Sequence, residues 1–162
     1  MRSNSTSRLT DGQLRSVVGR TALVLALVLL SGIIHELGHV LALAYFGIPS
    51  RIEWHGWMLV TTPAFGQLTG TQVVAFYENI LWICVSGGLF AFVVLSPLLR
   101  YRYLAWIPLS HLLYSAFEPA MILLRPYPCV GEFYLYASVA SCMFSVLSVI
   151  LTPGWRDVMS NE

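Results

Sequence analysis

His35 and His39 flank Glu36 in the segment His35-Glu36-Leu37-Gly38-His39, and these side chains could do chemistry together. On a helix, residues four apart lie on one face, so both imidazoles can reach one metal ion at about 2.0–2.1 Å. Glu36 projects beside such an ion, where it can take a proton from water and return it to a leaving amine. The spacing is typical of zinc-dependent hydrolysis of peptide bonds.

The composition shows which kind of element must position these residues. Hydrophobic residues make up 57% of the 162 residues and charged residues only 10%, whereas soluble domains carry about 25% charge. Four apolar stretches, at about 21–46, 76–99, 103–124 and 133–152, reach the roughly 20 residues that cross a bilayer. We therefore expect an all-α membrane protein with four transmembrane helices in one domain, 21–152. A mobile polar tail, 1–20, should precede it and a short tail, 153–162, should follow.

The connection between the first two stretches, 47–75, is the longest one. Its segment 52–62 is rich in Trp, Val, Ile and Thr, and Pro49 and Pro63 bracket it. This pattern predicts one or two short strands at the membrane surface. The alternative is an irregular interfacial loop anchored by Trp54 and Trp57.

The His-Glu-x-x-His segment lies just past the middle of the first apolar stretch. A charged side chain at the centre of a membrane costs about 2.5–3.5 kcal/mol on the mildest scale, and a divalent metal would compensate for it. A hydrogen-bonded polar cluster that holds the bundle together is the alternative. Ser31, Gly32 and Ala42 share the face of the histidines, and small residues favour close helix packing. We expect the segment to face the bundle.

The segment 32–42, Gly-Ile-Ile-His-Glu-Leu-Gly-His-Val-Leu-Ala, resembles the first motif of the site-2 protease family (peptidase family M50). These intramembrane zinc proteases cut transmembrane segments of other proteins. The resemblance implies a β-hairpin at 47–75, a central helix whose small-residue motif is Ser86-Gly87-Gly88, and a third zinc ligand on the third helix. The chain departs from the family pattern in two places. Gly88 replaces the usual proline, and the third helix has no Asp.

A catalytic zinc usually takes three protein ligands and a water. The third helix offers Glu118 and His111, seven residues apart and so on one face. We predict Glu118, because two histidines and a glutamate form an established zinc set. Glu118 also stands eight residues after Ser110, the spacing between the Asn and Asp of the family motif. His111 is the alternative ligand or a second-shell partner, and Glu118 could instead pair with Arg125.

The charges and cysteines exclude other classes. The nine basic residues are all Arg and form no stripe, so nucleic-acid binding is not expected. The three cysteines, Cys84, Cys129 and Cys142, lack a CxxC spacing and are interpreted as packing residues. The distribution of Arg places both termini in the cytoplasm by the positive-inside rule, but the resemblance implies the opposite, so the orientation is left open.

The sequence therefore predicts an intramembrane zinc metalloendopeptidase with one Zn²⁺ per chain, held by His35, His39 and Glu118, and with Glu36 as catalytic base. Its partners would be membrane-spanning substrates and the lipid bilayer. One alternative is an inactive scaffold of the same fold, because the Asp of the third motif is missing. A metal or proton transporter is another, although its ionisable groups should be spread along a path. Substrate identity and oligomeric state do not follow from the sequence.

Overall fold

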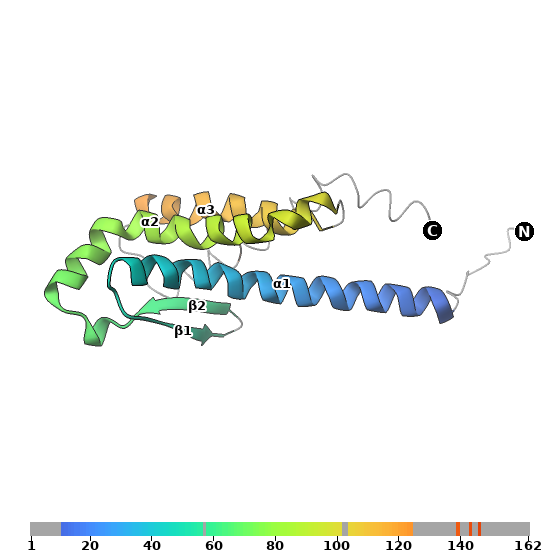
Figure 1. Ribbon diagram of the computed structural model, residues 1–162, viewed down its shortest axis with the longest axis horizontal. Helices are drawn as coiled ribbons and strands as arrows, with labels where there is room; N and C mark the ends of the chain where they lie inside the picture. Colours follow the sequence, from blue (N-terminus) through green and yellow to red (C-terminus); the bar gives the residue numbers. More distant parts are fainter. Residues whose placement is uncertain are drawn as a thin grey trace, which may run out of the picture.

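The computed structural model describes residues 11–56, 58–101 and 104–124 and the isolated positions 139, 143 and 146, with the backbone alone for 11–17 and 58. Within this part the chain forms three helices and a two-stranded sheet between the first two helices (Figure 1). The elements are α1 (Asp11–Tyr45), β1 (Ser50–His55), β2 (Met58–Pro63), η1 (Phe65–Gln67), α2 (Gly70–Leu95), η2 (Ser96–Arg100) and α3 (Trp106–Leu124).

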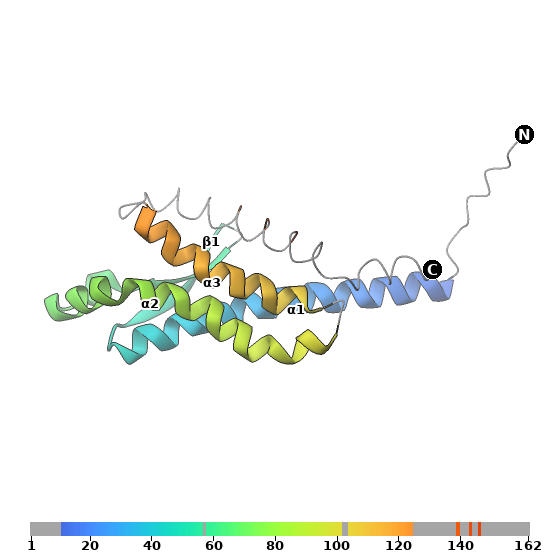
Figure 2. The same cartoon turned by 90° about the horizontal axis from the view of Figure 1, so that it is seen from above.

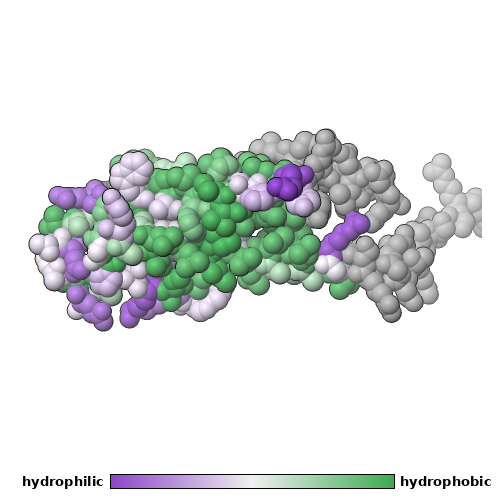
Figure 3. Space-filling model, viewed as in Figure 1, coloured by the Kyte–Doolittle hydropathy of each residue, from purple (hydrophilic) through white to green (hydrophobic). Residues whose placement is uncertain are grey.

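Three helical spans are long and apolar enough to cross a membrane: Val18–Tyr45 within α1 (28 residues), Gly70–Arg100 through α2 and η2 (31 residues), and Trp106–Leu124, which is α3 (19 residues). This finding is compatible with a membrane protein. The fourth expected helix, 133–152, lies outside the described residues apart from three isolated positions, as do 1–10 and the tail at 153–162. Figure 3 shows apolar residues across the middle of the visible face, and hydrophilic residues gather at the end that holds the hairpin and the start of α2.

The first helix is longer than predicted. It begins at Asp11 and not near residue 21, so 11–20 belong to α1. The segment has no proline and contains the good helix formers Gln13, Leu14 and Arg15. Asp11 is the first residue of α1, and acidic residues are favourable in the first turn of a helix. Local preference therefore extends the helix beyond its apolar part.

The second helix also begins earlier than predicted, at Gly70 and not at 76. Thr69 closes a capping box with Gln72, in which each side chain accepts a hydrogen bond from the other residue's backbone N–H, at 3.3 and 2.9 Å. Its α-helical part ends at Leu95, and the chain continues as η2, where Pro97 lacks the N–H that an α-helix needs. The third helix begins at Trp106 and not at the predicted residue 103, and it contains Pro119.

The hairpin confirms the strand prediction over the irregular loop. β1 and β2 pair antiparallel, with Ile52 opposite Thr61 and His55 opposite Met58. Gly56 turns the chain at a positive φ of 65°, which glycine adopts without steric cost. Trp54 is exposed on β1, in keeping with an interfacial position, while Trp57 lies outside the described residues.

Helix α2 is the central helix, because it packs against both α1 and α3. The hairpin lies on the other side of α1, so α1 separates it from the α2–α3 pair (Figures 1 and 2). Buried apolar side chains form two clusters between the helices. One contains Ala91, Leu95, Leu104, Trp106 and Ile107, and the other contains Leu43, Ile48 and Ile83. Along α1 the His-Glu-x-x-His segment lies between the parts that touch these two clusters.

Candidate metal centre

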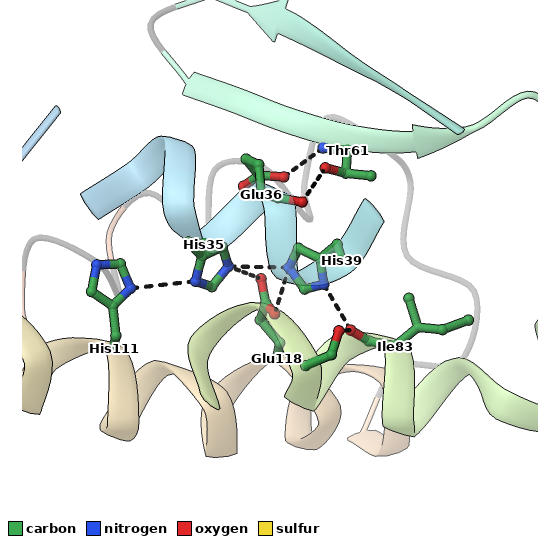
Figure 4. Close-up of polar contacts among 8 residues, drawn as sticks. His35, Glu36, His39, Thr61, Ile83, His111 and Glu118 are labelled. Atoms are coloured by element: carbon green, nitrogen blue, oxygen red, sulfur yellow. Dashed lines mark hydrogen bonds and ion pairs between the residues drawn. The ribbon is translucent and has the colours of Figure 1, made fainter. Parts of the chain in front are cut away.

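The two histidines of α1 point to the same place, as their spacing predicts. Their Nε2 atoms are 3.1 Å apart, and the rings meet edge to face. His35 is 5% exposed, so the face that carries the pair is turned into the bundle. Figure 4 shows both rings directed from α1 toward the other two helices.

Helix α3 brings Glu118 to this pair. Its Oε1 lies 3.5 Å from His35 Nε2 and its Oε2 lies 3.4 Å from His39 Nε2. Glu118 is buried, and no hydrogen bond reaches its Oε2 within the described part of the chain. A buried carboxylate requires a compensating positive partner. The structure thus places Glu118 where the third ligand was expected, while Arg125, its alternative partner, lies outside the described residues.

The separations of these three groups fit a single metal ion. Ligand atoms that lie 2.0–2.1 Å from a tetrahedral zinc are about 3.3 Å from one another. The two Nε2 atoms are 3.1 Å apart, and each has a different Glu118 oxygen at 3.4 or 3.5 Å. One ligand atom from each of the three residues lies within 4.8 Å of the other two, so a small adjustment would bring them to this spacing. His35, His39 and Glu118 could therefore hold one metal ion between them.

The Nδ1 atoms of both histidines have hydrogen-bond partners outside the triad, and this arrangement leaves the Nε2 atoms available to a metal. His39 Nδ1 lies 2.7 Å from the Ile83 carbonyl oxygen, which can only accept, so Nδ1 carries a proton, and in the neutral imidazole Nε2 then keeps its lone pair. His35 Nδ1 lies 3.3 Å from Nδ1 of His111. When His35 donates this bond, its Nε2 is also free for a metal. Metal-binding histidines are usually oriented through their second nitrogen in this way.

His111 is therefore placed behind His35 and not at the metal position. The ring centroids of His111 and His35 are 5.4 Å apart. Tyr114 also packs edge-on against the His35 imidazole, at 5.2 Å between centroids. Of the two candidates on α3, the structure directs Glu118 at the histidine pair and His111 at the far side of one histidine (Figure 4). Ser110 donates its hydroxyl to the Ile107 carbonyl within α3.

The small residues of α2 allow the helices to close around the site. A Cβ at Gly87 would overlap the His39 imidazole, and one at Gly88 would lie 2.7 Å from the Ser115 Cβ. Gly38 on α1 is equally tight, because a Cβ there would lie 2.7 Å from the Ser86 carbonyl oxygen. The absence of a side chain at Gly87 thus leaves space for the His39 ring, and its absence at Gly88 lets α3 approach α2 closely.

Glu36 lies on the opposite flank of α1, against the hairpin. Its side chain is buried, and Oε2 accepts a 2.6 Å hydrogen bond from the backbone N–H of Thr61 on β2. The Thr61 hydroxyl donates to the Glu36 backbone carbonyl at 3.0 Å. Sequence reasoning missed Thr61, because only the pairing register decides which residue of the strand meets Glu36. As expected, Glu36 does not join the three candidate ligands.

His55 and Cys84 are not among the three converging residues. His55 lies on β1, where its Nε2 is 3.5 Å from Glu53 Oε2. Cys84 on α2 is a free thiol, while Cys129 and Cys142 lie outside the described residues. No family model, curated protein or solved structure matches this chain. The site itself is therefore the only basis for assigning a function.

Proposed function

We propose that this chain is an intramembrane zinc metalloprotease of the site-2 protease type. One observation carries the proposal. His35, His39 and Glu118 converge at separations of 3.1–3.5 Å inside helices that are long and apolar enough to cross a membrane. A polar triad at membrane depth requires compensation, and a metal ion fits both its geometry and its orphaned carboxylate oxygen.

The donor set favours zinc. Two imidazoles and one carboxylate make a catalytic zinc set, which leaves a fourth position open. Zinc, when bound, would polarise a peptide carbonyl and activate water for attack. The partners of Nδ1 on both histidines would hold the rings in place for this task, and Glu118 would offset the charge of the ion.

Glu36 is the residue proposed to move the proton. It lies one residue from His35, on the flank of α1 that faces β2, so it can act on water from the hairpin side. Its carboxylate would accept a proton as a water oxygen attacks the carbonyl carbon, and deliver that proton to the leaving amine nitrogen as the C–N bond breaks. The triad and Glu36 thereby have separate tasks: three residues hold the ion and one transfers the proton.

The hairpin gives the substrate a place to bind. A transmembrane helix must unwind before its peptide bonds can be attacked, and lipid cannot satisfy the freed backbone groups. Strand β2 can pair with such an extended segment along its outer edge. Because β2 is the strand that contacts Glu36, a substrate paired there lies beside the proposed base.

The experiment combines metal analysis with cleavage. Full-length protein purified in detergent should bind one zinc ion per chain and cut a Leu/Ala transmembrane peptide of about 25 residues with a central Gly-Pro pair. His39→Ala should lose both properties, while His55→Ala, which changes a histidine outside the triad, should keep both. Zinc binding without cleavage of any membrane peptide would favour the inactive scaffold. Absence of zinc from the wild-type protein would refute the proposal.

A further inference from the structure

The outer edge of strand β2 has few hydrogen-bond donors. The backbone N–H of Ala64 donates to the Pro49 carbonyl at 2.8 Å, which continues the ladder with β1 one residue beyond Pro63. In an antiparallel pair, alternate residues point their N–H and C=O groups toward the partner strand. Val60 and Thr62 therefore face β1 with Ala64, while Leu59, Thr61 and Pro63 face outward. Pro63 has no N–H, so Leu59 and Thr61 carry the donors of this edge.

One of these two donors is already engaged. The Thr61 N–H holds the carboxylate of Glu36 at 2.6 Å, a short bond to a charged acceptor. An extended peptide that pairs with the outer edge of β2 would need the same N–H for its own carbonyl oxygen. The proposed catalytic base and the proposed substrate thus compete for one hydrogen-bond donor.

From this geometry we propose that Thr61 is a positioning residue that couples substrate pairing to the release of the base. Before a substrate binds, the Thr61 N–H keeps the Glu36 carboxylate against the hairpin. When a substrate strand pairs with β2, its carbonyl takes over the Thr61 N–H, and the carboxylate turns toward water at the metal site. The Thr61 hydroxyl stays on the Glu36 backbone carbonyl and keeps β2 in register with α1.

Under this coupling, Glu36 becomes available as a base only when a peptide is bound. Glu36 is 8% exposed, so its carboxylate depends on protein partners. A base that is engaged until a peptide arrives cannot activate water in the absence of substrate. The inference rests on the proposed protease function, and it adds how the substrate brings the base into use.

Two proline variants test it in the zinc-loaded full chain, with the same Leu/Ala peptide as substrate. Thr61→Pro removes the N–H that holds Glu36, and Leu59→Pro removes the other outward N–H. Proline is tolerated where a strand's N–H points away from its ladder. Both variants lose one docking donor and should show a raised KM. The coupling predicts that kcat of Thr61→Pro stays within about threefold of that of Leu59→Pro, because the carboxylate is free once substrate is bound.

The opposite result is equally clear. If the Thr61 N–H must hold Glu36 during the reaction, Thr61→Pro loses a hydrogen bond to a charged group, and kcat should fall about 10-fold or more relative to Leu59→Pro. A loss larger than threefold therefore overturns the coupling. Thr61→Val keeps the N–H and removes only the hydroxyl, so it shows how much of any change comes from the loss of register.

A spectroscopic measurement keeps the inference testable if the proline variants do not fold. In zinc-loaded wild-type protein labelled with ¹⁵N-threonine, the Thr61 amide signal is assigned by its absence from Thr61→Val. Adding the peptide with a methyleneamine in place of its scissile amide should shift this signal, since the acceptor changes from a carboxylate to a peptide carbonyl. Binding without a shift overturns the coupling. If the wild-type protein neither binds nor cuts the peptide, the proposed function itself fails.

Discussion

On the side of α1 that faces α2 and α3, His35 and His39 meet a carboxylate, an imidazole and a backbone carbonyl, all from other helices. On the side that faces the hairpin, Glu36 bonds to Thr61, through a backbone N–H and a hydroxyl. Both sides bury polar groups, but they are built differently. On the helical side the packing is tight, because a methyl group added at Gly38, Gly87 or Gly88 would overlap neighbouring atoms. The hairpin side depends on a strand-edge donor that can change partners.

This difference suggests a division of labour along one helix. Holding a metal requires fixed ligands, and tight helix packing supplies them. Transferring a proton during turnover requires a group that can change its environment, and an open strand edge supplies that. Mutations on the helical side should therefore act on metal binding, and mutations on the hairpin side should act on turnover.

The largest effect is expected for Glu36→Gln. The amide keeps the shape of the side chain but cannot take up a proton, so cleavage of the transmembrane peptide should fall by at least about 10²–10⁴-fold. Zinc content should stay at the wild-type level, because Glu36 is not one of the three converging residues. Glu53→Gln on β1 is the matched control. Cleavage by Glu36→Gln at the wild-type rate would remove the distinction between the two sides.

Glu118→Ala should abolish tight zinc binding. Zinc would keep two histidine ligands only, and catalytic zinc sites usually have three protein ligands. We expect zinc affinity to fall by more than about 100-fold, beyond the range for residues behind the ligands. Competition with a chelating dye measures it. Retention of zinc in this variant together with its loss in His111→Ala would make His111 the ligand.

His111→Leu should weaken zinc binding less, by about 10–100-fold, because it removes the partner of His35 Nδ1 and no ligand. His111→Gln can still accept a hydrogen bond from His35, so it should restore part of the affinity. A purely structural role would give no difference between these two variants in metal affinity. The visible spectrum of the cobalt-substituted protein reports whether the ligand geometry is kept.

Gly87→Ala tests how tightly the helical side is packed. The added methyl group overlaps the His39 ring, so the ring or α2 must move, at a cost of about 1–3 kcal/mol in stability. Zinc affinity should fall as well. Gly32→Ala on α1, where a Cβ meets nothing within 4 Å, is the control. Equal thermal stability and zinc content in the two variants would contradict the close packing.

The smallest effect is expected for deletion of residues 1–15. The apolar span that carries the site begins at Val18, so it remains whole. The deleted part of α1 lies at the end remote from the hairpin (Figure 1). Unfolding midpoint, zinc content and cleavage should match the full chain. A loss of zinc would show that the start of α1 supports the site at a distance.

Much of the site could be predicted because helical spacing fixes local geometry. The four-residue spacing of His35 and His39 sets their common face, and the zinc set of two histidines and a glutamate indicated Glu118. The Glu36–Thr61 contact could not be predicted, because the register of β2 depends on the turn at Gly56 and on packing against α1. The β-branched and aromatic residues were enough to predict the hairpin. They did not indicate which edge of the hairpin faces α1.

The sequence contains a signal for helix starts, the capping-box spacing, that was not used to predict the helix limits. Thr69 and Gln72 have the spacing of a capping box, which would have placed the start of α2 at Gly70. The sequence before α1 has the same spacing, with Thr10 followed by Gln13 three residues later, and this is typical of a helix that begins at Asp11. Hydropathy locates the apolar part of a helix and not its solvated ends.

The position of His39 along α1 has a consequence for the products of the proposed reaction. His39 is six residues from the end of α1 at Tyr45, or about 9 Å at 1.5 Å per residue, and about 31 Å from Val18. In the proposed reaction, a substrate cut at this depth would be divided unequally. The fragment on the hairpin side would keep too few apolar residues to remain anchored and would enter the water, while the other fragment would keep most of its span and stay in the lipid. Cleavage would thus release a soluble fragment on one side of the membrane only.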